Sequence, residues 1–191
     1  ITARSTPSLS AIAQSDYDPM WSTQDTDPAY VLNPSNQRVW SANARVVSTA
    51  DLPRYGDGGY ALGARQHQIM DALVESDSFS ESSFYKLQLD NRALFLMPWH
   101  NLLEKTLIEN PQKFAADLKA LKEWKACACS DSIGYTLVRY FRSAVINTLM
   151  LPVEKQLLEH DLHLRHSMRK IEGGIWQVLR EKPEHWLPDE Y

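Results

Sequence analysis

The stretch that decides the fold is Asn33-Pro34-Ser35-Asn36-Gln37-Arg38-Val39-Trp40-Ser41-Ala42-Asn43-Ala44-Arg45-Val46-Val47. Its Asn-Pro pair favours a turn, and the β-branched residues that follow favour a strand. We therefore expect two short strands, at 31–32 and 38–47, joined by a turn. Alternation along the second strand would place Asn43 near its exposed end, with Trp40 on the opposite face.

A helical pattern begins at Gly63 and continues towards the end of the chain. Ser80 and Ser132 are placed to cap helices, and Pro98 is expected to divide a long stretch. Further helices are expected at about 111–125, 132–149 and 152–179, the last interrupted at Gly173-Gly174. The predicted fold class is mainly α with a small β element. It has an extended lead-in at 1–30, a β-turn segment at 31–60 that carries Asn43, and a helical region at 61–191.

Composition excludes several classes of function. With 191 residues, 43% of them hydrophobic, the chain is long enough for one globular domain with a core. The net charge of -4 without long charged runs argues against a nucleic-acid partner. No apolar run approaches the roughly 18 to 20 residues that cross a bilayer, so no membrane partner is expected. Cys127 and Cys129 are two residues apart, and this close spacing predicts two free thiols.

The spacing of three residues supports a family resemblance. Asn43 follows Asn33 by ten residues, and Arg65 follows Asn43 by 22. With these residues, the chain resembles the penicillin acylase (penicillin amidase) family of N-terminal-nucleophile hydrolases. Later landmarks of the same resemblance are Leu87-Gln88-Leu89-Asp90-Asn91, Leu121-Lys122-Glu123-Trp124 followed by Asp131-Ser132, and Lys182-Pro183-Glu184-His185-Trp186-Leu187-Pro188. The resemblance runs from about Asn33 to Tyr191 and implies the helical portion of an αββα fold.

The resemblance also implies roles for two side chains. Amide hydrolysis needs donors aimed at the oxygen that becomes negative in the tetrahedral intermediate, and a neutral carboxamide is suited to this task. By resemblance, Asn43 is that donor and Arg65 positions it. Two alternatives stay open: Asn43 could simply end a strand, and Arg65 could form a salt bridge with Asp71 or Asp90.

The family's nucleophile is a free N-terminal Ser, exposed by self-cleavage and located far upstream of the Asn-Pro turn. Because this chain begins with Ile1-Thr2-Ala3-Arg4, we expect an internal piece of the catalytic subunit of a larger acylase, inactive alone. Its expected partners are the remaining segments of that protein and a small acyl-amide substrate, with an arylacetyl or a fatty acyl group. The resemblance favours a periplasmic or secreted location. The alternative function is a non-catalytic helical binding module of acylase ancestry.

Other polar residues predict structural roles. Many members of the family hold a structural calcium ion, which stays open for the larger protein. Neither Asp51 nor Asp57 falls at the expected offset, so no cofactor is expected in this chain. The spacing of His160, His163 and His166 predicts a solvated basic helix face, because three such side chains diverge too far to share a metal. Asp90 is expected to accept hydrogen bonds between helices without pairing with Arg92.

Overall fold

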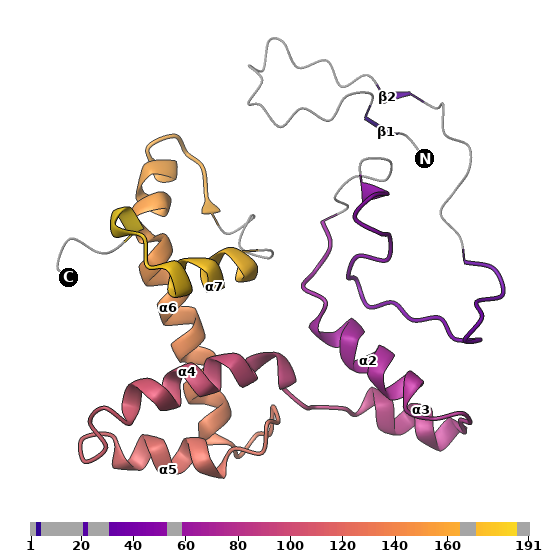
Figure 1. Cartoon of the computed structure of the whole chain (residues 1–191), viewed down its shortest axis with the longest axis horizontal. Helices are drawn as coiled ribbons and strands as arrows, with labels where there is room; N and C mark the ends of the chain where they lie inside the picture. Colours follow the sequence, from indigo (N-terminus) through magenta and orange to yellow (C-terminus); the bar gives the residue numbers. More distant parts are fainter. Residues whose placement is uncertain (1–2, 5–20, 23–30, 53–58, 165–170, 187–191) are drawn as a thin grey trace. The chain divides into compact units, whose positions relative to one another are not determined.

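The computed structural model describes residues 3–4, 21–22, 31–52, 59–164 and 171–186. The chain divides into two compact units, residues 1–77 and residues 78–191. Figure 1 labels their helices and strands.

In its described residues, the first unit contains a minimal sheet and helix α2. Strands β1 (Ala3–Arg4) and β2 (Trp21–Ser22) pair in antiparallel fashion, and helix α2 spans Ala64–Val74. Residues 31–47 lie in turns, bends and irregular backbone, so the two strands expected at 31–32 and 38–47 are not formed. A strand needs a neighbour for its backbone groups, and no described residue forms a ladder with this stretch.

The second unit is helical, which confirms the mainly α prediction. Its order is α3 (Glu81–Gln88), the 3₁₀ turn η2 (Leu94–Leu96), α4 (Met97–Leu107), α5 (Ala115–Glu123), α6 (Ile133–Leu158), α7 (Glu172–Glu181) and the 3₁₀ turn η5 (Glu184–Trp186). Helices α4, α5 and α6 pack on one another, with α6 much the longest (Figure 1). No helix in the described part of the chain is both long and apolar enough to cross a membrane.

Short-range signals fixed several helix starts as expected. Ser80 caps α3 through a reciprocal capping box with Ser83, and the Ser132 hydroxyl accepts a hydrogen bond from the Tyr135 N–H at the start of α6. Pro98 lies in the first turn of α4, where its missing N–H has no intrahelical partner to lose.

The expected breaks at Pro152 and at Gly173-Gly174 are wrong. Pro152 lies inside α6, and both glycines lie in the first turn of α7. Proline removes one hydrogen bond from a helix, but Met150 is buried and Val153 packs against the core on either side of it. The glycines interrupt nothing because N–H groups in a first turn lack intrahelical acceptors in any case.

The core of the second unit is built around Trp99, which is fully buried. Its ring centroid lies 4.5 Å from that of Trp176 on α7, and Phe141 on α6 meets it edge to face at 6.3 Å. Leu121 from α5 and Val138 from α6 are also fully buried in this cluster. Trp99 of α4 therefore contacts aromatic side chains of both α6 and α7.

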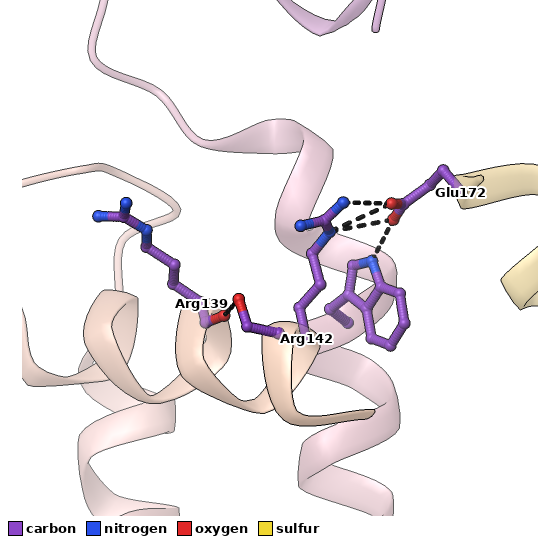
Figure 2. Close-up of polar contacts among 5 residues, drawn as sticks. Arg139, Arg142 and Glu172 are labelled. Carbon is purple, nitrogen blue, oxygen red and sulfur yellow. Dashed lines mark hydrogen bonds and ion pairs between the residues drawn. The ribbon is translucent and has the colours of Figure 1, made fainter. Parts of the chain in front are cut away.

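A buried carboxylate links helices α4, α6 and α7. Glu172, only 8% exposed, accepts a 2.5 Å hydrogen bond from Trp99 Nε1 and is paired with the Arg142 guanidinium. Figure 2 shows the Arg142 fork aimed at both carboxylate oxygens, while Arg139 on the same helix extends away from them. Arg142 also lies 5.4 Å from the Phe95 ring. The charge is thus compensated by α6 and hydrogen-bonded by α4.

Cys127 and Cys129 form a disulfide, so the prediction of two free thiols is wrong. Their Cα atoms are 5.3 Å apart, within the usual range for a disulfide despite the close sequence spacing. The same loop pairs with the segment before α4. Ala128 N–H donates to Asn91 C=O at 2.8 Å, and Ala93 N–H donates to Ala126 C=O at 2.6 Å.

Asp90 and Arg92 pair with each other, contrary to the prediction. Arg92 Nε and Nη2 donate to the Asp90 carboxylate at 2.9 and 2.8 Å. The prediction assumed a helix, in which residues two apart diverge. Helix α3 ends at Gln88, and the irregular backbone that follows brings the two side chains together.

Replacing the buried carboxylate by Glu172→Gln should lower the free energy of unfolding by about 3 kcal/mol, because it leaves the Arg142 cation without its anion. Urea unfolding followed by tryptophan fluorescence measures the change, since Trp99 reports on this core. The control is Glu109→Gln, which removes an exposed carboxylate and should leave stability unchanged. Equal stability of the two variants would contradict the structural role of Glu172.

Gly134→Ala should also destabilise the second unit. A Cβ at this position would lie 2.5 Å from Ala120 C=O and 2.6 Å from Trp124 Cβ, so α5 and α6 would have to move apart. We expect a loss of about 1–3 kcal/mol, typical of overpacking. Gly173→Ala is the matched control: its Cβ meets no atom within 4 Å, and alanine should be neutral or stabilising there. Thermal unfolding of both variants tests the contrast.

Candidate active site

The Asn33-Pro34 pair forms the predicted turn. Gln37 N–H donates to Pro34 C=O at 2.8 Å, and Asn33 and Gln37 have φ values of 49° and 54°. Arg38 then anchors the turn within the first unit, because its Nη2 donates to the Ser76 C=O just after α2 at 2.5 Å. The chain therefore leaves this turn in a fixed direction.

Asn43 lies at a left-handed backbone position. Its φ is 59°, a conformation that Asn adopts more readily than most residues. Its C=O accepts a hydrogen bond from Ala61 N–H at 2.8 Å, and the next residue, Ala44, is buried. The backbone at Asn43 is therefore held from both sides, although the side chain is exposed.

Arg65 is the second residue of α2 and contacts Asn43 directly. Its Nη2 donates to Asn43 Oδ1 at 2.9 Å and to Ala42 C=O at 3.2 Å. Its neighbour Gln66 donates to Arg45 C=O at 3.4 Å. The first turn of α2 thus binds the loop on both sides of Asn43, and the two residues singled out by the family resemblance lie together.

This contact fixes the orientation of the Asn43 amide. A guanidinium has only donors, so it selects the oxygen of a carboxamide and turns the NH₂ group the other way. Within the described part of the chain, no acceptor is assigned to Asn43 Nδ2. The arrangement therefore presents a neutral, oriented donor that can bind a developing negative charge.

The alternatives for these two residues do not fit the geometry. Asn43 ends no strand, because residues 41–47 are bends and irregular backbone. Asp71, although it lies on the same helix as Arg65, forms no ion pair with it among the described contacts. Asp90 pairs with Arg92.

A hollow of about 410 Å³ lies beside the Asn43 loop. Trp40 borders it, as do residues on both sides of Gly63: Ala44, Arg45, Ala61, Gln66, His67 and Met70. Asn43 and Arg65 do not line this hollow. Trp40 therefore borders the hollow without Asn43; the opposite faces expected for these two residues assumed a strand, which does not form.

The other polar candidates lie apart from this pair. His163 Nδ1 is 3.6 Å from Glu154 Oε1, and both His160 and His163 follow the end of α6, so they do not form a helix face. His166 and Asp57 lie outside the described residues. Asp51 accepts a hydrogen bond from the Ser48 hydroxyl. The described residues contain no cluster of three potential metal ligands.

Comparison with known protein families decides the ancestry. A model of the penicillin amidase family matches residues 10–190. The chain belongs to the penicillin amidase family. No curated protein and no solved structure gave a significant match. Membership of this family of hydrolases gives the chain an amidohydrolase ancestry.

Sequence reasoning missed two hydrogen bonds that hold the loop around Asn43. The hydrogen bond from Ala61 N–H to Asn43 C=O joins two backbone groups, so no residue type in the sequence predicts it. Gln66 follows Arg65 directly in the first turn of α2, and its position next to the implied site residue was a usable signal.

The left-handed backbone predicts different effects of two substitutions of Asn43. The free energy of opening the loop should be about 1 kcal/mol lower in Asn43→Ala than in Asn43→Gly, because alanine is strained at positive φ and glycine is not. Hydrogen exchange at the Ala61 amide is a local reporter, since that N–H binds Asn43 C=O. Exchange should be about fivefold faster in the alanine variant; equal rates would show that the loop does not hold this conformation.

Proposed function

We propose that this chain is part of an amidohydrolase that cleaves the linear amide between an acyl group and an amine. The observation that carries the proposal is the hydrogen bond from Arg65 Nη2 to Asn43 Oδ1. Family membership supports the reaction class, and the contact supports a specific place for the chemistry. The substrate class is a small acyl amide, with an arylacetyl or fatty acyl group.

In the proposed reaction, Asn43 Nδ2 donates to the oxyanion of the tetrahedral intermediate. Charge on that oxygen grows only as the nucleophile attacks, so a donor already held in place stabilises the transition state more than the substrate. Arg65 is a positioning residue that acts through Asn43. Because Arg65 withdraws electron density from Oδ1, it also makes the Nδ2 group a stronger donor.

The proposal assigns the nucleophile to a segment outside residues 1–191. An N-terminal nucleophile combines a hydroxyl with its own α-amino group as base, and the chain described here supplies the oxyanion donor and its support. The remaining segments of the enzyme are then the chain's partners, and the fold around them is the αββα arrangement of N-terminal-nucleophile hydrolases. No metal or cofactor takes part in this scheme.

We also propose a periplasmic or secreted location. The support is the Cys127–Cys129 disulfide, since disulfides persist in oxidising compartments and are rare in reducing ones. The family resemblance favours the same location. Direct mapping of this disulfide in protein isolated without reductant tests the compartment.

Removal of the Asn43 carboxamide should abolish most of the activity. In the full-length enzyme, Asn43→Gly keeps the positive φ but removes the donor, so kcat for an acyl anilide should fall about a hundredfold or more, with KM little changed. The matched control is Asn33→Gly, which makes the same replacement at another left-handed position and should leave kcat close to the wild-type value. A gel must show that all variants are cleaved as the wild type is.

The outcomes separate the proposal from its rival. Near wild-type turnover by a folded, cleaved Asn43→Gly enzyme would exclude Asn43 from the oxyanion site. A wild-type enzyme that neither cleaves itself nor hydrolyses any acyl amide would favour a non-catalytic binding module of penicillin amidase ancestry.

A further inference from the structure

A hollow of about 280 Å³ lies where α5 ends and α6 begins, and the Cys127–Cys129 disulfide forms part of its wall. Charged side chains of both signs line the same hollow, those of Glu123, Lys125 and Asp131. Both cysteines are partly exposed. A small neutral thiol that enters the hollow therefore meets the disulfide directly.

The disulfide adds little to the stability of the whole unit. Its cysteines are only two residues apart, and a cross-link that closes so short a loop removes little entropy from the unfolded chain. Leu121 on α5 and Val138 on α6, on either side of the loop, are fully buried in the core. We therefore expect α5 and α6 to stay packed when the bond is reduced.

The bond instead restrains the loop between the two helices. The backbone of this loop pairs with the segment before η2 through one antiparallel bridge and two flanking hydrogen bonds, namely Arg92 with Cys127, Ala93 N–H to Ala126 C=O and Ala128 N–H to Asn91 C=O. Ala126 has a φ of 54°, a left-handed conformation that is unfavourable for alanine. We expect this strained loop to relax once the cross-link beside Ala126 is removed.

The two sulfur atoms of the disulfide differ in their surroundings. Asn91 Nδ2 donates a hydrogen bond to Cys129 Sγ at 3.5 Å. A hydrogen-bond donor stabilises negative charge on sulfur, so Cys129 is the better leaving group when the bond is broken. Attack by an incoming thiolate is therefore directed to Cys127 Sγ.

We propose that Cys127–Cys129 is a thiol–disulfide exchange site, which a small dithiol reduces through the hollow, and that reduction releases the loop from residues 91–93. One thiolate of the dithiol attacks Cys127 Sγ and forms a mixed disulfide, while the electron pair of the broken bond goes to Cys129 Sγ. The inference is independent of the proposed catalytic role of Asn43.

A second step completes the exchange. The other thiolate of the dithiol attacks the reagent sulfur that is bound to Cys127, closes a cyclic disulfide and releases Cys127 as a thiolate. The dithiol is thereby oxidised by two electrons. The two protons that it loses to water are replaced by two that water gives to the cysteine thiolates.

The first test is reduction of the folded full-length enzyme by dithiothreitol, a neutral dithiol. Free thiols are trapped with N-ethylmaleimide after increasing times, and the peptides that contain Cys127 and Cys129 are quantified by mass spectrometry. The rate should rise in proportion to the dithiothreitol concentration, while circular dichroism shows that the helices remain. A bond that resists the reagent until the protein unfolds would overturn the proposal.

Asn91→Ala tests the direction of the exchange. Loss of the donor to Cys129 Sγ should slow reduction about fivefold, the effect of one hydrogen bond. Asn110→Ala is the matched control, because it removes the same amide from an exposed position that follows the other end of α4, and it should react at the wild-type rate. An equal or faster rate in Asn91→Ala would contradict the assignment of Cys129 as the leaving group.

Hydrogen exchange tests the effect of reduction on the loop. The amides of Ala93 and Ala128, which donate across the pairing, should exchange about tenfold faster in the reduced enzyme than in the oxidised one. The Ile146 amide, within α6, is the internal control and should keep its rate. An enzyme with both Cys127→Ser and Cys129→Ser should match the reduced form without any reductant. Equal protection of Ala93 and Ala128 in both states would show that the disulfide does not hold the pairing.

Discussion

The second unit depends on the compensation of one buried charge, the carboxylate of Glu172. A carboxylate transferred from water to a protein interior is stable only if it is paired and hydrogen-bonded. Here the cation comes from Arg142 on α6 and the hydrogen bond from Trp99 on α4. Glu172 is also the first residue of α7, where the helix dipole favours a negative charge. These contacts together hold the first turn of α7 against α4 and α6.

Sequence patterns predicted the parts of the fold that local interactions determine. Ser80 and Ser132 cap helices by accepting hydrogen bonds from backbone N–H groups three residues later. Pro98 lies in the first turn of α4, where its ring is compatible with the helix. Each of these helix starts could therefore be predicted from a few neighbouring residues. The failures were non-local. Pro152 lies within a helix because residues on both sides pack on the core, and the strands expected around Val39 did not form because a strand requires a partner that sequence alone does not name. The outcome at Cys127 depended on loop backbone that no pattern specified.

The candidate site shows the same division. The Asn33-Pro34 turn and the start of α2 at Gly63 were predictable, and the family resemblance singled out Asn43 and Arg65. Composition and periodicity alone would not have joined these two residues, because 22 residues separate them and the hydrogen bond depends on how the intervening chain returns. The left-handed backbone at Asn43 was likewise hidden, since alternation predicts an extended one.

Two features of the surroundings of Asn43 run against local backbone and helix preferences. Asn43 occupies a sparsely populated backbone region, and Arg65 places a cation in the first turn of α2, where the helix dipole favours an anion and where no acid is present. Both features cost some stability, and both serve the contact with Asn43 Oδ1. Pro152 and Gly134 in the second unit, by contrast, are each accounted for by close packing. Both features near Asn43 converge on one exposed, oriented side chain that fills no core, and this arrangement supports the proposed role of Asn43 as an oxyanion donor.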